Sequence, residues 1–262
     1  MRAIRQGDAW RSAVHALICC LAGASVVAVV VAAGWSCGPA SGGEAAAPAT
    51  SPGQAGLVGW WSFDGGRGST ARDRSGLGNH GAICGAERVP GKVGKGLRFA
   101  AGGSCVRIPC RPSLNLGSAL SIEAWVCPAE PADVSRVILS KNDEYALRVD
   151  KASEGGRISF FPHVGSPAVA WEPRVSSKAA PTSGAWHHVA AVWDGRKERL
   201  YLDGVLEAET DRAGRPNPDP YPLMIGNWEY PSCHGTCFGG VLDEVKLWSR
   251  ALSAEEVARH AE

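Results

Sequence analysis

The fold of this chain is most constrained by one strand that is apolar on both faces, in the segment WHHVAAVWDG. An extended backbone places Val189, Ala191 and Trp193 on one side. Ala190 and Val192 fall on the other side. A strand with no polar face is typical of one that lies between two packed layers. The segment therefore predicts a layered β structure with this strand near its centre.

A hairpin follows this strand. The next apolar run reaches Asp203-Gly204, and the chain then continues as VLEA. Asp-Gly tolerates the positive φ values of a two-residue hairpin turn, so the pattern predicts an antiparallel pair. Similar short runs recur along the chain without intervening helices, which favours an all-β, two-sheet antiparallel sandwich. We expect strands at residues 58–63, 81–84, 96–100, 105–108, 121–127, 137–141, 145–149, 157–161, 168–171, 187–193, 199–202, 205–209, 223–225 and 240–248.

One short helix is predicted at the C-terminus. Ser253 can cap it, and Glu256, three residues later, completes a capping box. Leu252 can pack onto Val257 as a hydrophobic staple. We expect this helix to cover the sandwich and to form no domain of its own.

The N-terminal region has the pattern of a targeting segment. Arg2, Arg5 and Arg11 precede residues 16–34, which carry no charge and are mainly apolar. This length lies between the core of a signal peptide and a membrane-spanning helix, so cleavage after Ala33 and an uncleaved anchor both stay open. In either case the positive flank stays inside, and we expect the rest of the chain to be exported, either secreted or membrane-anchored.

Three regions follow from this composition. Residues 1–37 are the signal peptide or signal anchor, residues 38–56 are a flexible linker rich in Ala, Gly, Pro and Ser, and residues 57–262 are a single sandwich. The net charge of +1 gives no case for binding nucleic acid or for a polybasic membrane patch. Contact with a membrane is expected only through the N-terminal segment, if it is uncleaved.

Six cysteines lie in the sandwich region, and an even set in an exported chain favours disulfides. The short spacing CHGTC predicts a local Cys233–Cys237 bridge, and the pairing of the other four stays open. Zinc is disfavoured because no second close cysteine pair exists. The six are Cys84, Cys105, Cys110, Cys127, Cys233 and Cys237.

Several motifs occur in the order found in one known family. They are GWWSFD from Gly59, DRSGLGNHG from Asp73, IEAWV from Ile122, WHHVA from Trp186 and GVLDEV from Gly240. Residues 57–261 thereby resemble the laminin G-like jelly rolls of the concanavalin A-type lectin and glucanase superfamily. The resemblance implies a jelly-roll sandwich. It says little about activity, because this fold carries lectins, adhesive modules and hydrolases.

A calcium ion is predicted near the last strand. Asp243 is in register with the apolar residues Val241, Val245 and Leu247, and a carboxylate on a buried face is costly unless it is paired or bound to a cation. The resemblance implies a structural calcium between the first and last strands. On that basis we expect ligands from Asp64, Asp243 and Asn79, with Asp73 as a further candidate, because calcium accepts irregular sets of oxygen ligands.

Four aromatic residues in or beside turns are candidate ligand contacts. They are Trp171, Tyr221, Trp228 and Tyr230, three of them in the proline-rich insert 215–231. Rigid loop aromatics can stack on sugar rings or anchor a protein partner. The alternative, that they fold back over the edge of the sandwich, stays open.

The sequence offers little support for catalysis. Glu123 is alone on its strand, and Asp243 and Glu244 are adjacent, so they face opposite ways in a regular strand. The adjacent His187 and His188 have no accompanying Gly-x-Ser-x-Gly elbow. We therefore expect a non-catalytic extracellular module that recognises a glycan or a cell-surface protein, with calcium as a structural ion. The alternatives are a glycan-cleaving enzyme on the same fold and a purely architectural surface domain.

Overall fold

The computed structural model describes residues 54–65, 68–100, 103–142, 144–164, 172–216, 218–229 and 236–262. The predicted targeting segment and most of the linker lie outside these ranges. Among the helices in the described ranges, none has the length and apolar character needed to cross a bilayer.

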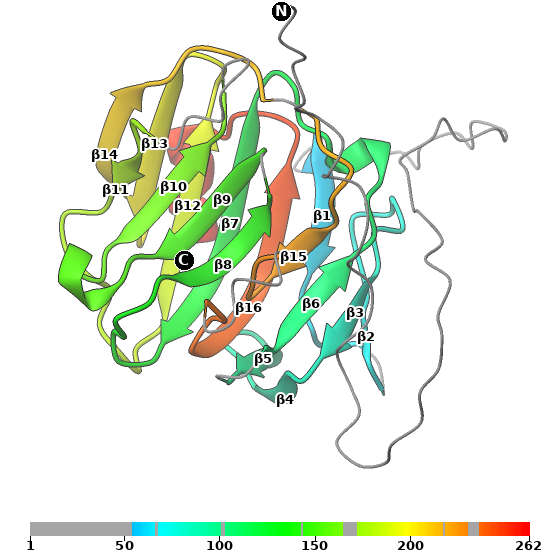
Figure 1. The fold of residues 1–262 in the computed structure, drawn as a ribbon. Helices are drawn as coiled ribbons and strands as arrows, with labels where there is room; N and C mark the ends of the chain where they lie inside the picture. The colour runs from blue at the N-terminus through cyan, green and yellow to red at the C-terminus, as the bar shows by residue number, and fades with distance from the viewer. Residues whose placement is uncertain are drawn as a thin grey trace, which may run out of the picture. The chain divides into compact units, whose positions relative to one another are not determined.

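The described chain forms two antiparallel sheets that pack face to face, and Figure 1 looks onto the second sheet with the first behind it. The first, sheet A, has the order β14-β13-β12-β7-β16-β5-β4, and β1 also pairs with β16. Its strands are β1 (Leu57–Trp61), β4 (Glu87–Pro90), β5 (Lys95–Phe99), β7 (Leu120–Pro128), β12 (His187–Trp193), β13 (Lys197–Leu202), β14 (Val205–Asp211) and β16 (Gly240–Trp248).

The second, sheet B, has the order β11-β10-β9-β8-β15-β6-β3-β2. Two 3₁₀ turns, Pro112–Leu114 and Ala152–Glu154, and the helix α1 (Ala254–His260) complete the described elements. The predicted all-β sandwich with a short C-terminal helix is confirmed. The strands of sheet B are β2 (Thr70–Ala71), β3 (Gly81–Cys84), β6 (Cys105–Ile108), β8 (Arg136–Lys141), β9 (Tyr145–Val149), β10 (Ile158–Pro162), β11 (Val175–Ser176) and β15 (Leu223–Ile225).

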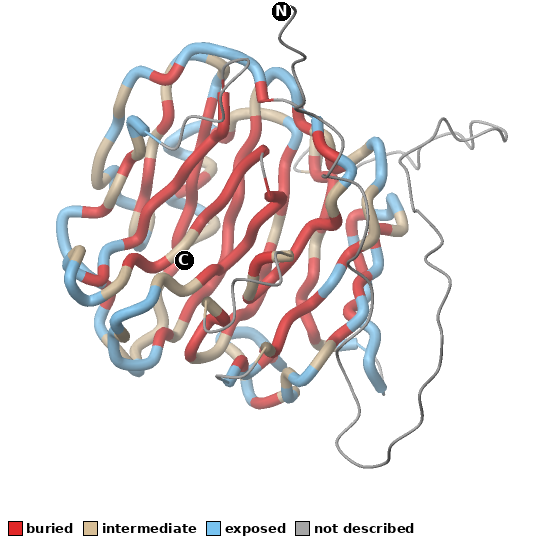
Figure 2. The backbone as a smooth tube through the Cα atoms, viewed as in Figure 1, coloured by how far each residue is buried: buried red, intermediate tan, exposed pale blue. Residues whose placement is uncertain are grey.

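The strand that is apolar on both faces lies between two layers, as predicted. Val189, Ala191 and Trp193 of β12 belong to the core between the sheets. Ala190 and Val192 belong to a second apolar cluster, on the outer face of sheet A, which contains Val257 of the helix. Figure 2 shows the resulting continuous burial along the central strands of both sheets.

The local signals at the end of the chain also hold. Asp203 and Gly204 both have positive φ, at 50° and 78°, and join β13 to β14 as a two-residue turn. The Ser253 side chain accepts a hydrogen bond from the backbone of Glu256, and the Glu256 carboxylate accepts one from the backbone of Ser253. The capping box is therefore formed on both sides.

The last strand differs from its expected regular alternation. The pairing of β16 with β7 shifts register between Asp243 and Lys246, and Glu244 has a φ of 48°. This β-bulge changes which residues face the core: Leu242, Val245 and Leu247 lie there, and Val241 does not. Asp243 is fully buried and shares a face with Val241, since a Cβ on Gly96 would meet both side chains. The expectation that Val245 and Leu247 lie on that same face is wrong, because the bulge turns them to the core.

The predicted strand positions are otherwise close to those found. The short strands β2, β4 and β11 were not expected, because each has a single Val or Ala beside polar residues or proline. The expected strand at residues 168–171 lies outside the described residues.

Leu247→Ala tests the assignment of the core. Leu247 is fully buried between the sheets, so we expect truncation to lower the free energy of unfolding by about 2 to 5 kcal/mol, measured by denaturant titration. The matched control is Leu206→Ala on β14, where the side chain is 42% exposed and the cost should stay within about 0.5 kcal/mol. Equal effects of the two changes would contradict the core assignment.

Candidate functional site

The acidic residues predicted to bind calcium meet at one turn between β4 and β5. The backbone N–H of Val93 donates to Asp243 Oδ2 at 2.9 Å, and the N–H of Lys95 donates to Asp64 Oδ1 at 2.9 Å. The turn fits closely around these oxygens. A Cβ on Gly91 would lie 2.4 Å from Asp243 Oδ2, and one on Gly94 would lie 2.1 Å from Asp64 Oδ1. The structure thus places the carboxylates of Asp64 and Asp243 against the same turn, residues 91–95.

Asp243 is the electrostatically unusual member of this pair. Burial raises the pKa of its carboxyl group to about 7, although two backbone N–H donors lower it in part. The charges of Glu244 and Asp64 raise the pKa further. The described hydrogen bonds to its carboxylate come from the backbone N–H groups of Val93 and Glu244, and neither donor is charged. A buried carboxylate of this kind favours a positively charged partner.

Asn79 and Asp73 belong to a different arrangement. The Asn79 amide donates to the carbonyl oxygen of Val58 at 2.7 Å and exchanges hydrogen bonds with Ser113. Asp73 accepts from the backbone of Trp60 and Ser75. The two residues fix the glycine-rich loop to β1, and neither contacts Asp64 or Asp243 directly through a described hydrogen bond.

A groove of about 380 Å³ lies beside the acidic pair, on the outer face of sheet A. We call it the tryptophan groove, because Trp60 of β1 and Trp125 of β7 line it. The remaining lining residues come from the β1–β2 connection, the glycine-rich loop 73–81, the β4–β5 turn, β16 and the C-terminal residues. They are Asp64, Arg74, Lys92, Val93, Glu244, Lys246, His260 and Glu262.

Cationic side chains lie over both tryptophans of the groove. The Lys92 ammonium is 4.1 Å from the centroid of the Trp125 ring. The Arg74 guanidinium lies 4.7 Å from the Trp60 ring, and the Lys246 ammonium lies 5.5 Å from it. The indole N–H of Trp60 donates to Glu244 at 2.7 Å. Cation–π contacts of this kind hold long charged side chains over aromatic surface that would otherwise face water.

A buried carboxylate fixes one wall of the groove. Glu123 is 1% exposed and accepts from the Trp248 indole at 2.9 Å and from His260 Nδ1 at 2.9 Å. His188 Nε2 lies 3.6 Å from the same carboxylate. Since an ionised carboxylate only accepts, Nδ1 of His260 carries its proton. The His260 ring, stacked on Trp248, is therefore held in one orientation beside the groove.

The predicted aromatic contacts are only partly within the described residues, because Trp171 and Tyr230 lie outside them. Trp228 packs with Val137, Ala146 and Phe161 in a small apolar cluster on sheet B. Tyr221 is half-buried and lies apart from that cluster. The Trp228 ring is 9% exposed, so it offers little surface for stacking in this conformation.

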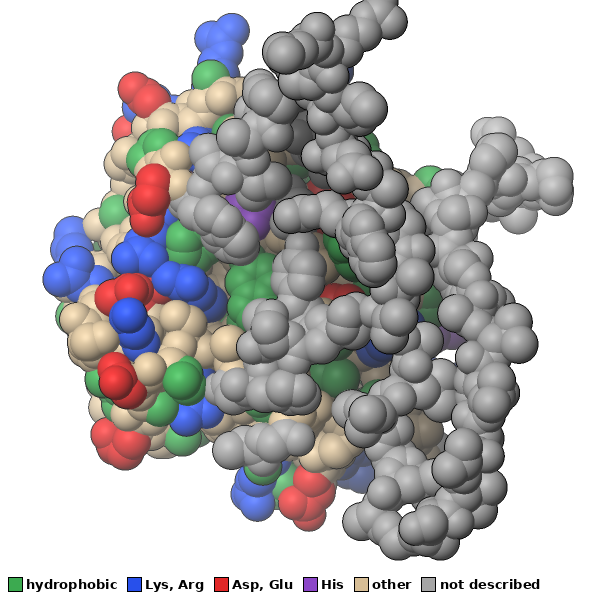
Figure 3. Space-filling model, viewed as in Figure 1, with side chains coloured by type: hydrophobic (Ala, Val, Ile, Leu, Met, Phe, Trp, Pro, Cys, Tyr) green, Lys and Arg blue, Asp and Glu red, His purple; other side chains and the backbone are tan. Residues whose placement is uncertain are grey.

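Charged side chains surround this cluster on the face of sheet B. Arg148 and Arg174 lie over the Phe161 ring, and both pair with Asp150 and Glu154. Figure 3 views this face and shows cationic and anionic side chains side by side there. Because each arginine is paired with carboxylates of the protein, these residues form a surface ion-pair network and offer a ligand no unpaired charge.

The predicted local disulfide is not formed. Cys237 is a free thiol, and Cys233 lies outside the described residues. The Cys237 sulfur is buried in the core, within 3.1 Å of the carbonyl oxygens of Ala100 and Ser104. Cys110 is disulfide-bonded. Cys84 and Cys105 face each other across the β3–β6 pair as thiols.

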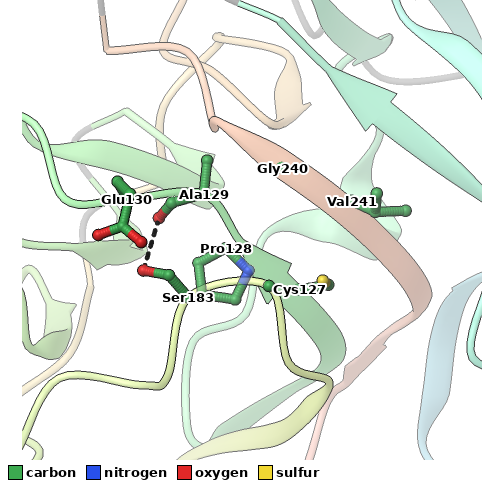
Figure 4. Close-up of a pocket in the computed structure, with 8 residues that line it drawn as sticks. Cys127, Pro128, Ala129, Glu130, Ser183, Gly240 and Val241 are labelled. Atoms are coloured by element: carbon green, nitrogen blue, oxygen red, sulfur yellow. Dashed lines mark hydrogen bonds between the residues drawn. The ribbon is translucent and has the colours of Figure 1, made fainter.

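A second hollow, of about 360 Å³, lies where β7 ends and β16 begins (Figure 4). Cys127 lines it as a thiol whose pKa is raised by burial. Ser183 donates to the carbonyl oxygen of Ala129 there. Its lining residues include neither an aromatic ring nor a basic group, so it lacks the groups that make the tryptophan groove a candidate binding site.

Comparison with known proteins agrees with this architecture. The family model for the concanavalin A-like lectin/glucanases superfamily matches residues 100–258. The chain belongs to this superfamily. No curated protein matches the sequence.

Several solved structures share the fold at low sequence identity. The binding domain of Paraclostridial Mosquitocidal Protein 1 has a TM-score of 0.61 and 16% identity, over 80% of this chain and 52% of that one. The Botulinum neurotoxin serotype G binding domain has a TM-score of 0.59 and 16% identity, over 78% and 50%. This chain thus spans about half the length of these two toxin chains.

A third structure is matched along almost its whole length. It is domain 4 of AbnA, a GH43 extracellular arabinanase from Geobacillus stearothermophilus, in complex with arabinotriose. Its TM-score is 0.59 and its identity is 21%, over 79% of this chain and 99% of that one. Together the three show that the chain shares their fold.

Sequence reasoning did not find the tryptophan groove. Trp125 belongs to the expected strand 121–127 and is 8% exposed, and neither it nor Trp60 was among the predicted ligand contacts. One available signal was the double tryptophan at Trp60-Trp61, because adjacent residues of a strand face opposite sides. With Trp61 in the core, Trp60 had to lie on the outer face.

Replacement of His188 tests the buried polar cluster. Burial lowers the pKa of His188 from 6.5 to about 4, against the opposing effect of Glu123. Between pH 4 and 6.5 His188 is protonated in the unfolded chain and neutral in the folded chain. The free energy of unfolding therefore falls as the pH drops from 6.5 to 4. We expect His188→Gln to reduce this acid loss by roughly 3 kcal/mol, measured by denaturant unfolding at pH 7 and at pH 4. An identical pH dependence in the variant and the wild type would contradict the assignment.

Proposed function

We propose that this protein is a non-catalytic recognition domain that binds carbohydrate outside the cytoplasm, and that the tryptophan groove is its binding site. The observation that carries the proposal is the groove itself. It combines two indole rings with basic, acidic and imidazole groups on a rigid sheet, in a hollow large enough for one or two sugar rings. Its groups are held by strands on two sides and by a turn on the third, which favours binding with little reorganisation.

The fold relatives support a binding role. Domain 4 of AbnA was solved with arabinotriose, and the two toxin structures are binding domains. At these identities they say nothing of the position of a site in this chain. The location proposed here rests on its own residues.

The acids around the groove support a role without catalysis. Glycoside hydrolysis needs one carboxyl group to give a proton and a second to attack or to activate water. Glu123 accepts from Trp248 and His260, and Glu244 accepts from the Trp60 indole. Both carboxylates thus serve the fold as hydrogen-bond acceptors.

We further propose that Asp64 and Asp243 hold a calcium ion that stabilises the β4–β5 turn. The fit is supported by the buried Asp243 carboxylate, by the proximity of Asp64, and by the two glycines that leave room for oxygen ligands. Oxygen donors of this kind suit calcium. Asn79 is left out of this proposal because its amide is bonded to Val58 and Ser113.

Export is part of the same proposal. It is supported by the sequence pattern of Arg2, Arg5 and Arg11 before the apolar residues 16–34. The linker would then separate the sandwich from the membrane or the cleavage site.

Glycan binding can be tested with the full chain, purified in mild detergent and applied to a broad glycan array. We expect retention of at least one glycan class without release of product. In Trp60→Ala, binding should fall about tenfold or more, whereas Tyr221→Ala, away from the groove, should bind normally. Product release would favour the enzyme, and no retention of any glycan would favour a protein-binding or architectural role.

Calcium binding can be tested by thermal unfolding with and without the ion. At 100 times its dissociation constant, calcium should stabilise the chain by about 2.7 kcal/mol, seen as a rise of several degrees in Tm. Asp243→Asn should abolish this rise. Asp211→Asn is the matched control, because that side chain is 88% exposed and should leave the rise intact. An unchanged calcium response in Asp243→Asn would refute the assigned site.

A further inference from the structure

The aromatic surfaces of the tryptophan groove are already covered by cations. Lys92 lies over Trp125, and Arg74 and Lys246 lie over Trp60. A neutral sugar that binds by stacking needs a bare aromatic face. On the covered faces it would first have to displace an ammonium or a guanidinium group. A cationic ligand would meet the same obstacle, with charge repulsion added.

The acids of the groove are largely occupied by partners within the protein. Asp64 accepts from Lys95 and from Arg74, at 2.9 and 3.4 Å. Glu244 accepts from the Trp60 indole and lies 3.8 Å from the Lys246 ammonium. Glu262, which is exposed, is the remaining acid of the lining. These partners leave the groove with fewer open acceptors than its composition alone would indicate.

Lys92 differs from the other two cations of the groove. Arg74 and Lys246 each lie within 4 Å of a carboxylate of the lining. Among the described residues Lys92 has no such ion pair, and its side chain is exposed. Its ammonium is therefore the group most open to a ligand.

The backbone that carries Lys92 is held on both sides. Val93 donates to Asp243, Lys95 donates to Asp64, and the N–H of Gly91 donates to the carbonyl oxygen of Gly94 at 3.0 Å. The turn therefore fixes the backbone of Lys92 at the rim of the groove, and the Trp125 ring supports its ammonium. A charge presented in this way loses less conformational entropy on binding than one on a loose loop.

We propose that the tryptophan groove selects acidic saccharides, and that Lys92 contacts their anionic group. This inference rests on the proposed function and names its ligand class. The shared chemistry is a carboxylate or a sulfate on a sugar ring. Arg74 and Lys246 line the same groove and can donate to neighbouring oxygens of such a ligand.

The experiment compares saccharides that differ only in charge. The full chain is titrated with oligogalacturonate and its methyl ester, and with sulfated and desulfated chondroitin, in one buffer containing calcium. We expect at least tenfold tighter binding to one acidic member than to its neutral or less charged counterpart. The preference should weaken as salt is raised, because exposed charges are screened. The carboxylate pair and the sulfate pair together identify which anion is recognised.

Two variants locate the effect. Lys92→Met keeps the length of the side chain over Trp125 and removes its charge, and we expect it to lose most of the preference for the acidic member. Lys197→Met is the matched control, because Lys197 pairs with Glu209 on β13 and is not part of the groove lining. Unchanged folding of both is checked by their unfolding transitions.

The outcomes separate the two proposals. Equal affinity for charged and neutral members, or a preference that survives in Lys92→Met, would overturn the inference and leave carbohydrate binding standing. Binding to none of these saccharides, together with an empty glycan array, would overturn the proposed function itself.

Discussion

Sheet A carries apolar side chains on both faces, and both faces must be buried by other elements. The position of the tryptophan groove depends on how far this burial extends over the outer face. The inner face packs against sheet B along its central strands. On the outer face, helix α1 covers Ala190, Val192 and Trp248 through Val257. The helix has only seven residues, so it cannot extend over the whole face. The tryptophan groove lies at this boundary, where the long side chains of Lys92, Arg74 and Lys246 shield the indole rings in place of a second layer.

Much of the fold could be predicted because apolar spacing, turn residues and helix caps are visible within a few consecutive residues. The apolar residues on both sides of β12 report the two layers that enclose it. The turn at Asp203-Gly204 and the capping box of Ser253 and Glu256 follow from backbone chemistry within four residues. The bulge at Asp243 and Glu244 was not predicted. One extra residue exchanges the inward and outward positions of the side chains that follow, and no residue type in this segment signals it.

The site was less accessible from the sequence. Asp64 and Asp243 could be singled out through the family resemblance, and the structure brings them to one turn. The tryptophan groove joins residues separated by more than 180 positions, such as Trp60 and Glu244. No local pattern encodes such a meeting. The predicted bridge at Cys237 is not formed for a related reason, because its sulfur packs in the core against Ala100 and Ser104, which are more than 130 positions away.

The pairing of β16 has a consequence for how this chain folds. This last strand lies between β7 on one side and both β5 and β1 on the other, and Leu57 is paired with Trp248. Until β16 is available, the middle of sheet A has no strand, and the edges of β7 and β5 stay open to other chains. Closure across nearly two hundred residues is slow, since the loop entropy must be overcome before the contacts form. Sheet A is therefore complete only when β16 has paired, and the unpaired edges of β7 and β5 favour aggregation in any state that lacks this strand.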